Sequence, residues 1–404
     1  MLRYSFYIRR HQTARWNQPI YLNDIHRIMK IAQRLNSIPM SGIRKMFDLA
    51  SPDSINLGLG EPDLSPPTEA IEGMCKASRE GFNKYGPTAG IMPLRDAVAK
   101  HYSRYAPVEG KNVMITPSGS SALLEVTQAM IDPGDEVLVP SPGFVIYGPH
   151  AVLAGGKDVY YKLTDGTFQP DIDDIQSKIT DRTTMLVINN PCNPTGGTLT
   201  EESFKALCDI SEDKGITIMA DEVYDSFVYE GKHISFLGQL DKAVVVGGFS
   251  KMMAVTGWRM GFVISNETVM DDLIKMQYHV CASPNMPAMY GILNALPTID
   301  DYIVKARETF RKRRDLIVKR INEIDGMEII PPKGAFYAFP KFDYNISSAD
   351  FAMECVKSGL ICTPGSAFGP YGEGHLRFSY AADEAKIDKG MDILSDVADK
   401  MRRL

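Results

Sequence analysis

Short apolar runs recur through the middle of the chain, and each is followed by a polar turn and a stretch with helical spacing. The clearest runs cover residues 113–116, 136–139, 185–188, 217–220 and 243–246. They are apolar at nearly every position rather than at alternate ones, which indicates strands buried on both faces. Such strands, alternating with helices, are typical of a mostly parallel sheet covered on both sides. The pattern therefore predicts an α/β fold.

Other patterned segments flank this region. Apolar spacing predicts two short amphipathic helices over residues 29–50, interrupted near Pro39. Residues 55–63 predict an extended segment that ends in a glycine-rich turn. Towards the end of the chain, the charged stretch 305–320 predicts a long helix that leads into a second domain, where Arg377 lies in an alternating strand.

Residues 1–28 do not share this patterning. Up to Asn23 they contain four arginines and no acidic residue, and their apolar run is too short and too interrupted for a secretory signal. Two interpretations stay open. One is a transit peptide; the other, which we favour, is an unstructured extension or an upstream start codon placed before a true start at Met29.

Composition and charge narrow the functional classes. The 404 residues are 44% hydrophobic, enough for a sizeable core and two or three domains, and no apolar run is long enough to span a bilayer. The net charge is −6 and the basic residues are scattered, so we expect neither a nucleic-acid nor a membrane partner. The six cysteines include no Cys-x-x-Cys pair, so we expect no metal site and a reducing, cytoplasmic location.

A lysine stands where the last apolar run ends. Lys251 follows the small-residue turn after residues 243–246, and Arg259 follows eight residues later. A buried ammonium without a partner costs several kcal/mol or loses its proton. The position therefore suits a lysine used as a neutral amine in a Schiff base. The alternative is an ordinary surface lysine at the end of a strand.

Candidate binding residues follow other runs, where ligands of parallel sheets collect. The small residues 118–121 begin a helix and offer free N–H groups to a phosphate, although serine there is also a common helix cap. Asp221 ends the run 217–220 and has the same alternative use as a cap. Phe144 has an ordinary core role as its alternative, and Arg377 that of an edge-strand charge.

The segment 246–261 resembles the lysine signature of fold type I pyridoxal-phosphate aminotransferases. In that family Ser-x-Ser-Lys is followed by Gly-x-Arg-x-Gly, and this chain has Phe249-Ser250-Lys251 and then Gly257-Trp258-Arg259-Met260-Gly261. The resemblance covers the chain from about Met29 to its end and is closest to archaeal and bacterial aromatic and aspartate aminotransferases. Gly248 departs from the common pattern, because many members have a phosphate-binding serine there.

This resemblance implies a large pyridoxal-phosphate-binding domain built on a mostly parallel seven-stranded sheet, and a smaller α+β domain. The implied limits are an extension over residues 1–28, an N-terminal segment joining the small domain over 29–74, the large domain over 75–297 and the small C-terminal domain over 298–404. It also implies a homodimer, in which Tyr85 reaches the cofactor phosphate of the neighbouring subunit.

The resemblance assigns roles to individual residues. Lys251 would carry the cofactor as a Schiff base and then transfer the substrate Cα proton. The phosphate would be bound by Gly119, Ser120, Ser121, Ser250 and Arg259. The ring would be held by Phe144 through stacking, by Asp221 at the pyridinium nitrogen, and by Asn193 and Tyr224 at the phenolate oxygen. The substrate would be bound by Gly60, Asn193 and Arg377, the last as a bidentate partner for the α-carboxylate.

The implied reaction moves an amino group from an L-amino acid to 2-oxoglutarate by a ping-pong mechanism. A carbon–sulfur lyase or an aminocyclopropane carboxylate synthase would keep the same central residues and is the main alternative. A phosphate-binding loop of nucleotide enzymes is excluded, because residues 247–251 lack its glycine–lysine spacing. A regulator with the same fold is disfavoured, because residues 1–28 are too few for a helix-turn-helix module.

Substrate choice depends on one position in the first phosphate loop. Some aspartate-preferring relatives have a lysine at the position of Ser120, which binds the distal carboxylate of aspartate. This chain has no cation there. The sequence therefore favours aromatic or broad specificity over strict preference for aspartate.

Overall fold

The computed structural model describes residues 31–38 and 51–402. The chain divides into two compact units after Ile38, and each is described by itself. In the first unit a 3₁₀-helix, η1 (Gln33–Ser37), replaces the α-helix expected near its start, and none of its side chains is buried. The extension 1–28 and the second helix expected before residue 50 lie outside the described residues.

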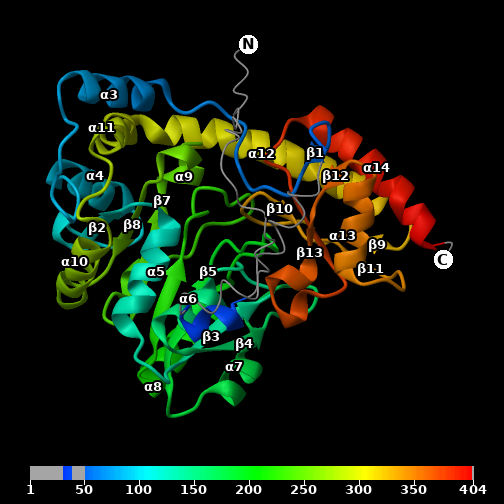
Figure 1. Ribbon diagram of the computed structural model, residues 1–404, viewed down its shortest axis with the longest axis horizontal. Helices are drawn as coiled ribbons and strands as arrows, with labels where there is room; N and C mark the ends of the chain where they lie inside the picture. The colour runs from blue at the N-terminus through cyan, green and yellow to red at the C-terminus, as the bar shows by residue number, and fades with distance from the viewer. Residues whose placement is uncertain (1–30, 39–50, 403–404) are drawn as a thin grey trace, which may run out of the picture. The chain divides into compact units, whose positions relative to one another are not determined.

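The second unit is built on a seven-stranded sheet (Figure 1). Its strands are β2 (Val113–Thr116), β3 (Glu136–Ser141), β4 (Lys157–Lys162), β5 (Thr183–Asn189), β6 (Thr217–Asp221), β7 (Ala243–Gly248) and β8 (Gly261–Ile264). Their order is β2-β8-β7-β6-β5-β3-β4, and only β8 runs antiparallel to its neighbours. The sheet confirms the predicted fold class, including all five strands expected from apolar runs.

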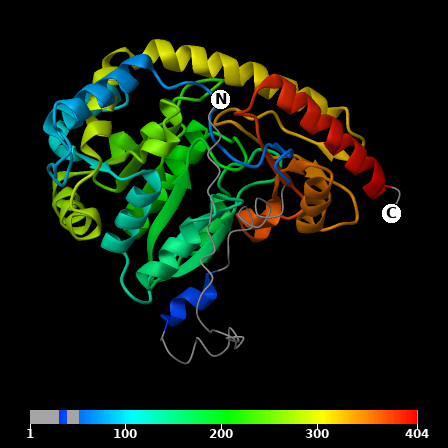
Figure 2. The same ribbon diagram turned by 45° about the horizontal axis from the view of Figure 1, so that its top comes forward.

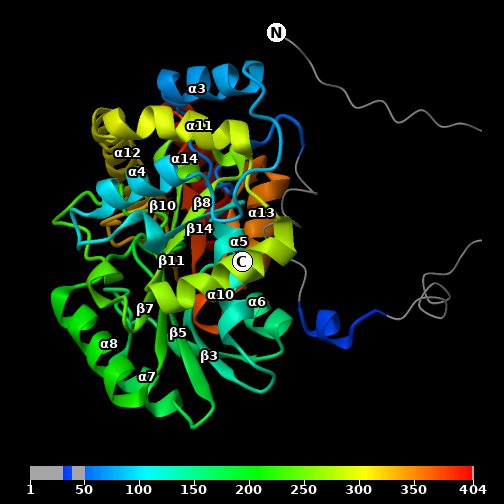
Figure 3. The ribbon, with the colours of Figure 1, turned by 90° about the vertical axis from the view of Figure 1, so that its left-hand side faces the viewer.

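Helices cover both faces of this sheet. One face packs against α5 (Gly119–Met130), α6 (Tyr147–Ala154) and α10 (Glu267–Cys281). The other packs against α4 (Met92–Tyr102), α7 (Ile172–Lys178), α8 (Glu201–Lys214) and α11 (Met286–Ala295). Figure 3 shows α6 and α8 on opposite sides of the strands. Successive strand residues point to opposite faces, so each apolar strand contributes to both cores.

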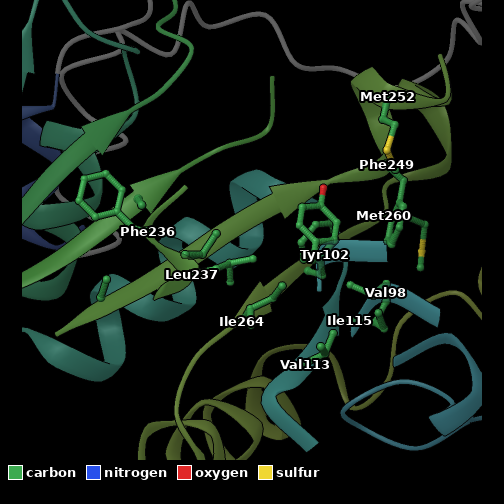
Figure 4. Close-up of a cluster of buried hydrophobic side chains, with 14 of the residues drawn as sticks. Val98, Tyr102, Val113, Ile115, Phe236, Leu237, Phe249, Met252, Met260 and Ile264 are labelled. Atoms are coloured by element: carbon green, nitrogen blue, oxygen red, sulfur yellow. The ribbon is translucent and has the colours of Figure 1, made fainter. Parts of the chain in front are cut away.

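The β2 strand shows how such a core is assembled. Its alternate residues Val113 and Ile115 face α4, where Val98 and Tyr102 meet them (Figure 4). All four side chains are buried. Met114, between them, points to the opposite core beside α5 and α10. A continuous apolar run is thus required for two-sided burial, which is why this pattern was a reliable signal of the sheet.

A third core lies among short strands and long helices towards the end of the chain. Three small sheets contribute: β1 (Ile55–Asn56) with β12 (Leu360–Ile361), β10 (Tyr337–Ala338) with β14 (Leu376–Ser379) and β13 (Thr363–Pro364), and β9 (Met327–Glu328) with β11 (Lys341–Phe342). The helices are α12 (Ile299–Asn322), α13 (Ser348–Lys357) and α14 (Glu384–Arg402), and Figure 2 shows α12 beside α14. The domain limits 74/75 and 297/298 stay a prediction.

The remaining elements are short or peripheral. They are α3 (Thr68–Arg79), α9 (Phe249–Met252), η2 (Gly110–Asn112), η3 (Phe236–Gln239), η4 (Thr256–Trp258), η5 (Leu296–Thr298), η6 (Gly365–Phe368) and η7 (Pro370–Gly372). No helix within residues 31–38 and 51–402 is long and apolar enough to cross a membrane.

Candidate active site

A cavity of about 220 Å³ lies beyond the carboxyl ends of β5, β6 and β7. It is the place that a parallel sheet favours for a ligand. The predicted site residues that line it are Gly60, Gly119, Ser120, Phe144, Asn193, Asp221, Tyr224, Ser250, Lys251, Arg259 and Arg377. Segments from Leu59 to Arg377 in the chain therefore meet at one cavity.

Two predicted residues do not line this cavity. The Ser121 hydroxyl donates a 2.7 Å hydrogen bond to the buried carboxylate of Glu125, one turn further along α5. The Tyr85 side chain is 88% exposed. Its predicted role needs a second subunit, so its exposure in a single chain neither supports nor opposes that role.

Lys251 reaches the cavity from α9, directly after β7. Its ammonium donates a 2.6 Å hydrogen bond to the Gly60 carbonyl. The pKa of this amine is lowered to about 8, mainly by burial; Glu61 opposes the shift, and Arg377 and Arg259 add to it. At neutral pH roughly a tenth of such lysines is unprotonated, far more than for a free lysine side chain.

Asp221 ends β6 and is buried. Its carboxylate accepts a 2.6 Å hydrogen bond from the Tyr147 hydroxyl and a 3.3 Å one from the Val223 amide. Burial raises the pKa of this carboxyl to about 6, while those two donors lower it. No cation in the described residues contributes to this shift. A cationic ligand atom in the cavity would relieve this cost of burial.

Arg377 enters from β14 and is almost completely buried. Its guanidinium donates to the Asn193 side-chain oxygen at 2.9 Å, to the Gly58 carbonyl and to the Thr363 hydroxyl. It also packs over the Tyr337 ring, 4.6 Å from its centroid. Its Nε has no partner among the described residues. A buried cation with an unused donor is suited to a carboxylate ligand.

A cluster of amide donors lies at the beginning of α5. The Ser118 hydroxyl accepts a hydrogen bond from the Ser121 amide and so caps this twelve-residue helix. A side chain at Gly261 would come within 2.4 Å of the Gly119 nitrogen, so glycine is required for this close approach. Ser120 and Arg259 line the cavity at the same place, and the arrangement is suited to an anion.

The Tyr337 hydroxyl contacts both Tyr224 and the backbone at Gly60. The Tyr224 hydroxyl lies 2.7 Å from the Tyr337 hydroxyl, and both are buried. A Cβ at Gly60 would lie 1.8 Å from that same hydroxyl of Tyr337, so no side chain fits at position 60. The Asn193 side-chain oxygen accepts from Arg377.

Comparison with known proteins decides the family. A model of the aminotransferase class I and II family matches residues 52–394. The aspartate aminotransferase of Pyrococcus abyssi is 36% identical over 385 residues, covering 91% of this chain and 98% of the relative. The chain belongs to the class I and II aminotransferases. It is a pyridoxal-phosphate-dependent enzyme, as all members of this family are, and the predicted resemblance is confirmed.

Other relatives of this aminotransferase differ in their named substrates. The aromatic-amino-acid aminotransferase 2 of Thermococcus litoralis is 35% identical, covering 91% of this chain and 98% of the relative. The solved structure of an aromatic aminotransferase from Pyrococcus horikoshii matches with a TM-score of 0.84 and 34% identity, covering 90% of this chain and 100% of that one. The solved structure of the Thermus thermophilus aspartate aminotransferase matches with a TM-score of 0.86 and 30% identity, covering 92% of this chain and 100% of that one.

Sequence reasoning missed three residues of the aminotransferase cavity or its walls. Tyr147 stands three residues after Phe144, and only its hydrogen bond to Asp221 reveals its importance. Tyr337 lies in an aromatic stretch that the sequence marks without a role. Thr256 gives no sequence signal, since threonine in a loop is common. Each depends on contacts between segments far apart in the chain.

Proposed function

We propose that this enzyme transfers the amino group of an aromatic L-amino acid, of aspartate or of both to 2-oxoglutarate by a ping-pong mechanism, with pyridoxal phosphate attached to Lys251. The observation that carries the proposal is Lys251 itself. Its amine has a pKa of about 8, lies in a cavity that also contains Asp221 and Arg377, and follows the strand that the family signature specifies.

The side chains of the cavity fit this cofactor. Asp221 is a buried carboxylate without a cation, which suits a protonated ring nitrogen. The residues that would hold the ring are Phe144, Asn193, Asp221 and Tyr224. The residues that would hold the phosphate are Gly119, Ser120, Ser250, Arg259 and Tyr85 of a second subunit. The engaged hydroxyl of Ser121 removes it from this set.

When bound, pyridoxal phosphate supplies an electrophilic carbonyl carbon and a ring that accepts the electrons of the substrate Cα–H bond. The chain supplies the rest. Arg377 binds the substrate carboxylate through its free Nε and a neighbouring donor, and Gly60 and Asn193 adjoin it. The Lys251 amine, once neutral and no longer attached to the cofactor, would take the Cα proton and deliver it to the C4′ carbon of the cofactor. Asp221, oriented by Tyr147, holds the negative charge beside the ring nitrogen.

We also propose a cytoplasmic homodimer with the domain limits expected from the sequence. The support for the dimer is a set of exposed large side chains close to Tyr85. Gly86 donates its amide to Ser283, and Tyr278 and Val280, in the last turn of α10, are 61% and 52% exposed. Exposed apolar side chains of this size favour a protein contact. Sedimentation of the purified protein with its cofactor tests this part.

The decisive experiment is borohydride reduction of the cofactor-loaded enzyme, followed by peptide mapping. We expect the mass of the reduced cofactor on Lys251 and on no other lysine. A label elsewhere, or none, would overturn the proposal. The reaction is tested separately by product analysis with 2-oxoglutarate and a panel of amino donors. Stoichiometric glutamate supports transamination, whereas release of ammonia or a thiol would show elimination instead.

A further inference from the structure

The turn over residues 57–61 is anchored at both ends and, in between, accepts hydrogen bonds from Arg377 at the Gly58 carbonyl and from Lys251 at the Gly60 carbonyl. Before it, the Leu57 amide donates to the Ile361 carbonyl. After it, the Asp63 carboxylate accepts two hydrogen bonds from Arg313, at 2.7 and 3.0 Å. Both anchors belong to the core of the short strands and α12. The tip of the turn, from Leu59 to Glu61, projects from these anchors to the cavity.

Two contacts tie this tip to the loop that carries Lys251. One is the hydrogen bond from the Lys251 ammonium to the Gly60 carbonyl. The other runs from the Thr256 hydroxyl to the Glu61 carboxylate. The first contact is lost whenever the lysine amine takes part in the reaction. The second then remains as the described tie between the turn and this loop.

Thr256 is well placed for such a tie. It lines the cavity beside Lys251, and its carbonyl accepts a 3.0 Å hydrogen bond from Arg259. The Glu61 carboxylate is thereby held at a part of the site that is rich in cations. The charged groups that act on the Lys251 amine are Glu61, Arg259 and Arg377. The other titratable residues that line the cavity are Asp221, Tyr224 and Tyr337. Glu61 is the acidic residue that raises the pKa of this amine, against burial and two arginines.

We propose that Glu61 and Thr256 form a clasp with two separable effects. The hydrogen bond positions Gly60, and with it the backbone that adjoins the substrate carboxylate. The charge of Glu61 stabilises the cationic state of the nitrogen at Lys251. Neither residue touches the reacting atoms, so both are positioning residues. The inference rests on the proposed attachment of the cofactor to Lys251.

Two substitutions separate the effects. Thr256→Val removes the hydroxyl and keeps the charge, while Glu61→Gln removes the charge and keeps an oxygen that accepts from Thr256. Glu69→Gln, at an exposed position in the first turn of α3, is the matched control. Each full-length variant is loaded with pyridoxal phosphate, and its thermal midpoint is compared with that of the parent enzyme to confirm folding.

We expect Thr256→Val to raise KM for the amino donor about fivefold and to change kcat by less than about twofold. A fivefold change corresponds to the loss of one hydrogen bond. We expect Glu61→Gln to move the pH midpoint of the visible cofactor absorbance about one unit lower, because the cationic form loses a nearby negative charge. If both variants behave like Glu69→Gln, the clasp is wrong. If only the absorbance stays unchanged in Glu61→Gln, the charge effect is wrong. Absence of a borohydride label on Lys251 in the parent enzyme would instead refute the proposed function.

Discussion

The two sides of the cavity are built differently. On the sheet side, Asp221 ends β6 and Asn193 lies in the turn after β5; both are at most 3% exposed and have buried partners. On the loop side of the cavity, Glu61 and Arg259 are exposed, and each forms a hydrogen bond with Thr256. Burial restricts a side chain to one geometry, whereas an exposed contact competes with water. The sheet side is therefore suited to the chemical step, and the loops to binding and release.

The substitution with the largest expected effect removes Lys251, which has a chemical task and lies in the short helix α9 directly after β7. Lys251→Ala should lower kcat more than about 10³-fold, because general acid–base catalysis is lost together with cofactor attachment. Steady-state aminotransferase assays measure this effect. Lys205→Ala, an exposed lysine on α8, is the control and should retain full activity. Equal activity in both variants would refute a chemical task for Lys251.

A second test removes the charge on the sheet side. The Asp221 carboxyl has a pKa of about 6 in the folded chain and an ordinary value of 3.8, so folding favours its protonated form. Its stabilising contribution is present at low pH and is lost as the pH rises to about 6. Asp221→Asn should therefore stabilise the cofactor-free protein by about 3 kcal/mol at pH 7 and by much less at pH 4, while activity falls.

Denaturant unfolding at the two pH values measures the stability, and the loaded enzyme provides the activity. A gain of the same size at pH 4 would contradict the assigned cause. Tyr147 can still donate to the new amide oxygen, and the weaker 3.3 Å hydrogen bond from the Val223 amide is the one that the substitution removes.

A third, smaller effect should follow from removing the hydroxyl of Tyr147, the hydrogen-bond partner of Asp221. Tyr147→Phe removes the 2.6 Å hydrogen bond that lowers the pKa of this carboxyl. We expect kcat to fall about tenfold with little change in KM, the size of a hydrogen bond to a charged group. The acidic limb of the kcat profile should shift to higher pH.

Tyr161→Phe is the matched control, because Tyr161 is equally buried and donates to the Val187 carbonyl away from the cavity. It should lower stability without moving the pH profile. A change in KM alone for Tyr147→Phe would show that this residue acts in binding, as expected of the loops, and would contradict the assignment of the sheet side to the chemical step.

The smallest predicted effect separates two adjacent serines. Ser120 lines the cavity, whereas the Ser121 hydroxyl donates to Glu125. Ser120→Ala should weaken the binding of pyridoxal phosphate about fivefold, the value of one hydrogen bond, and Ser121→Ala should leave it within about twofold. Equilibrium titration of the cofactor-free protein measures both. Equal weakening would return Ser121 to the phosphate site.

The sequence was sufficient for features that follow from local patterns. The five apolar runs predicted five strands of the sheet, and the position of Asp221 at the end of one run placed it at the cavity. It was insufficient for β4, which is half-buried with lysine at both ends, and for the four-residue β8. It also failed for η1, a 3₁₀-helix over Gln33–Ser37 where an α-helix was expected.

Contacts between distant segments were beyond reach for a different reason. Thr256 and Glu61 are separated by 195 positions, and Tyr147 and Asp221 by 74. Nothing in the local composition of either partner specifies the other. Such pairs depend on how the strands align and how the segments pack together, and both are fixed only when the chain folds.

The hydroxyl of Tyr337 occupies the space of a side chain at position 60. Positions 60 and 337 therefore cannot be substituted independently of each other. A library that varies position 60 alone should return only glycine, however strong the selection for a new substrate. Any larger residue there must come with a smaller one at 337, and that exchange would also take away the hydroxyl partner of Tyr224.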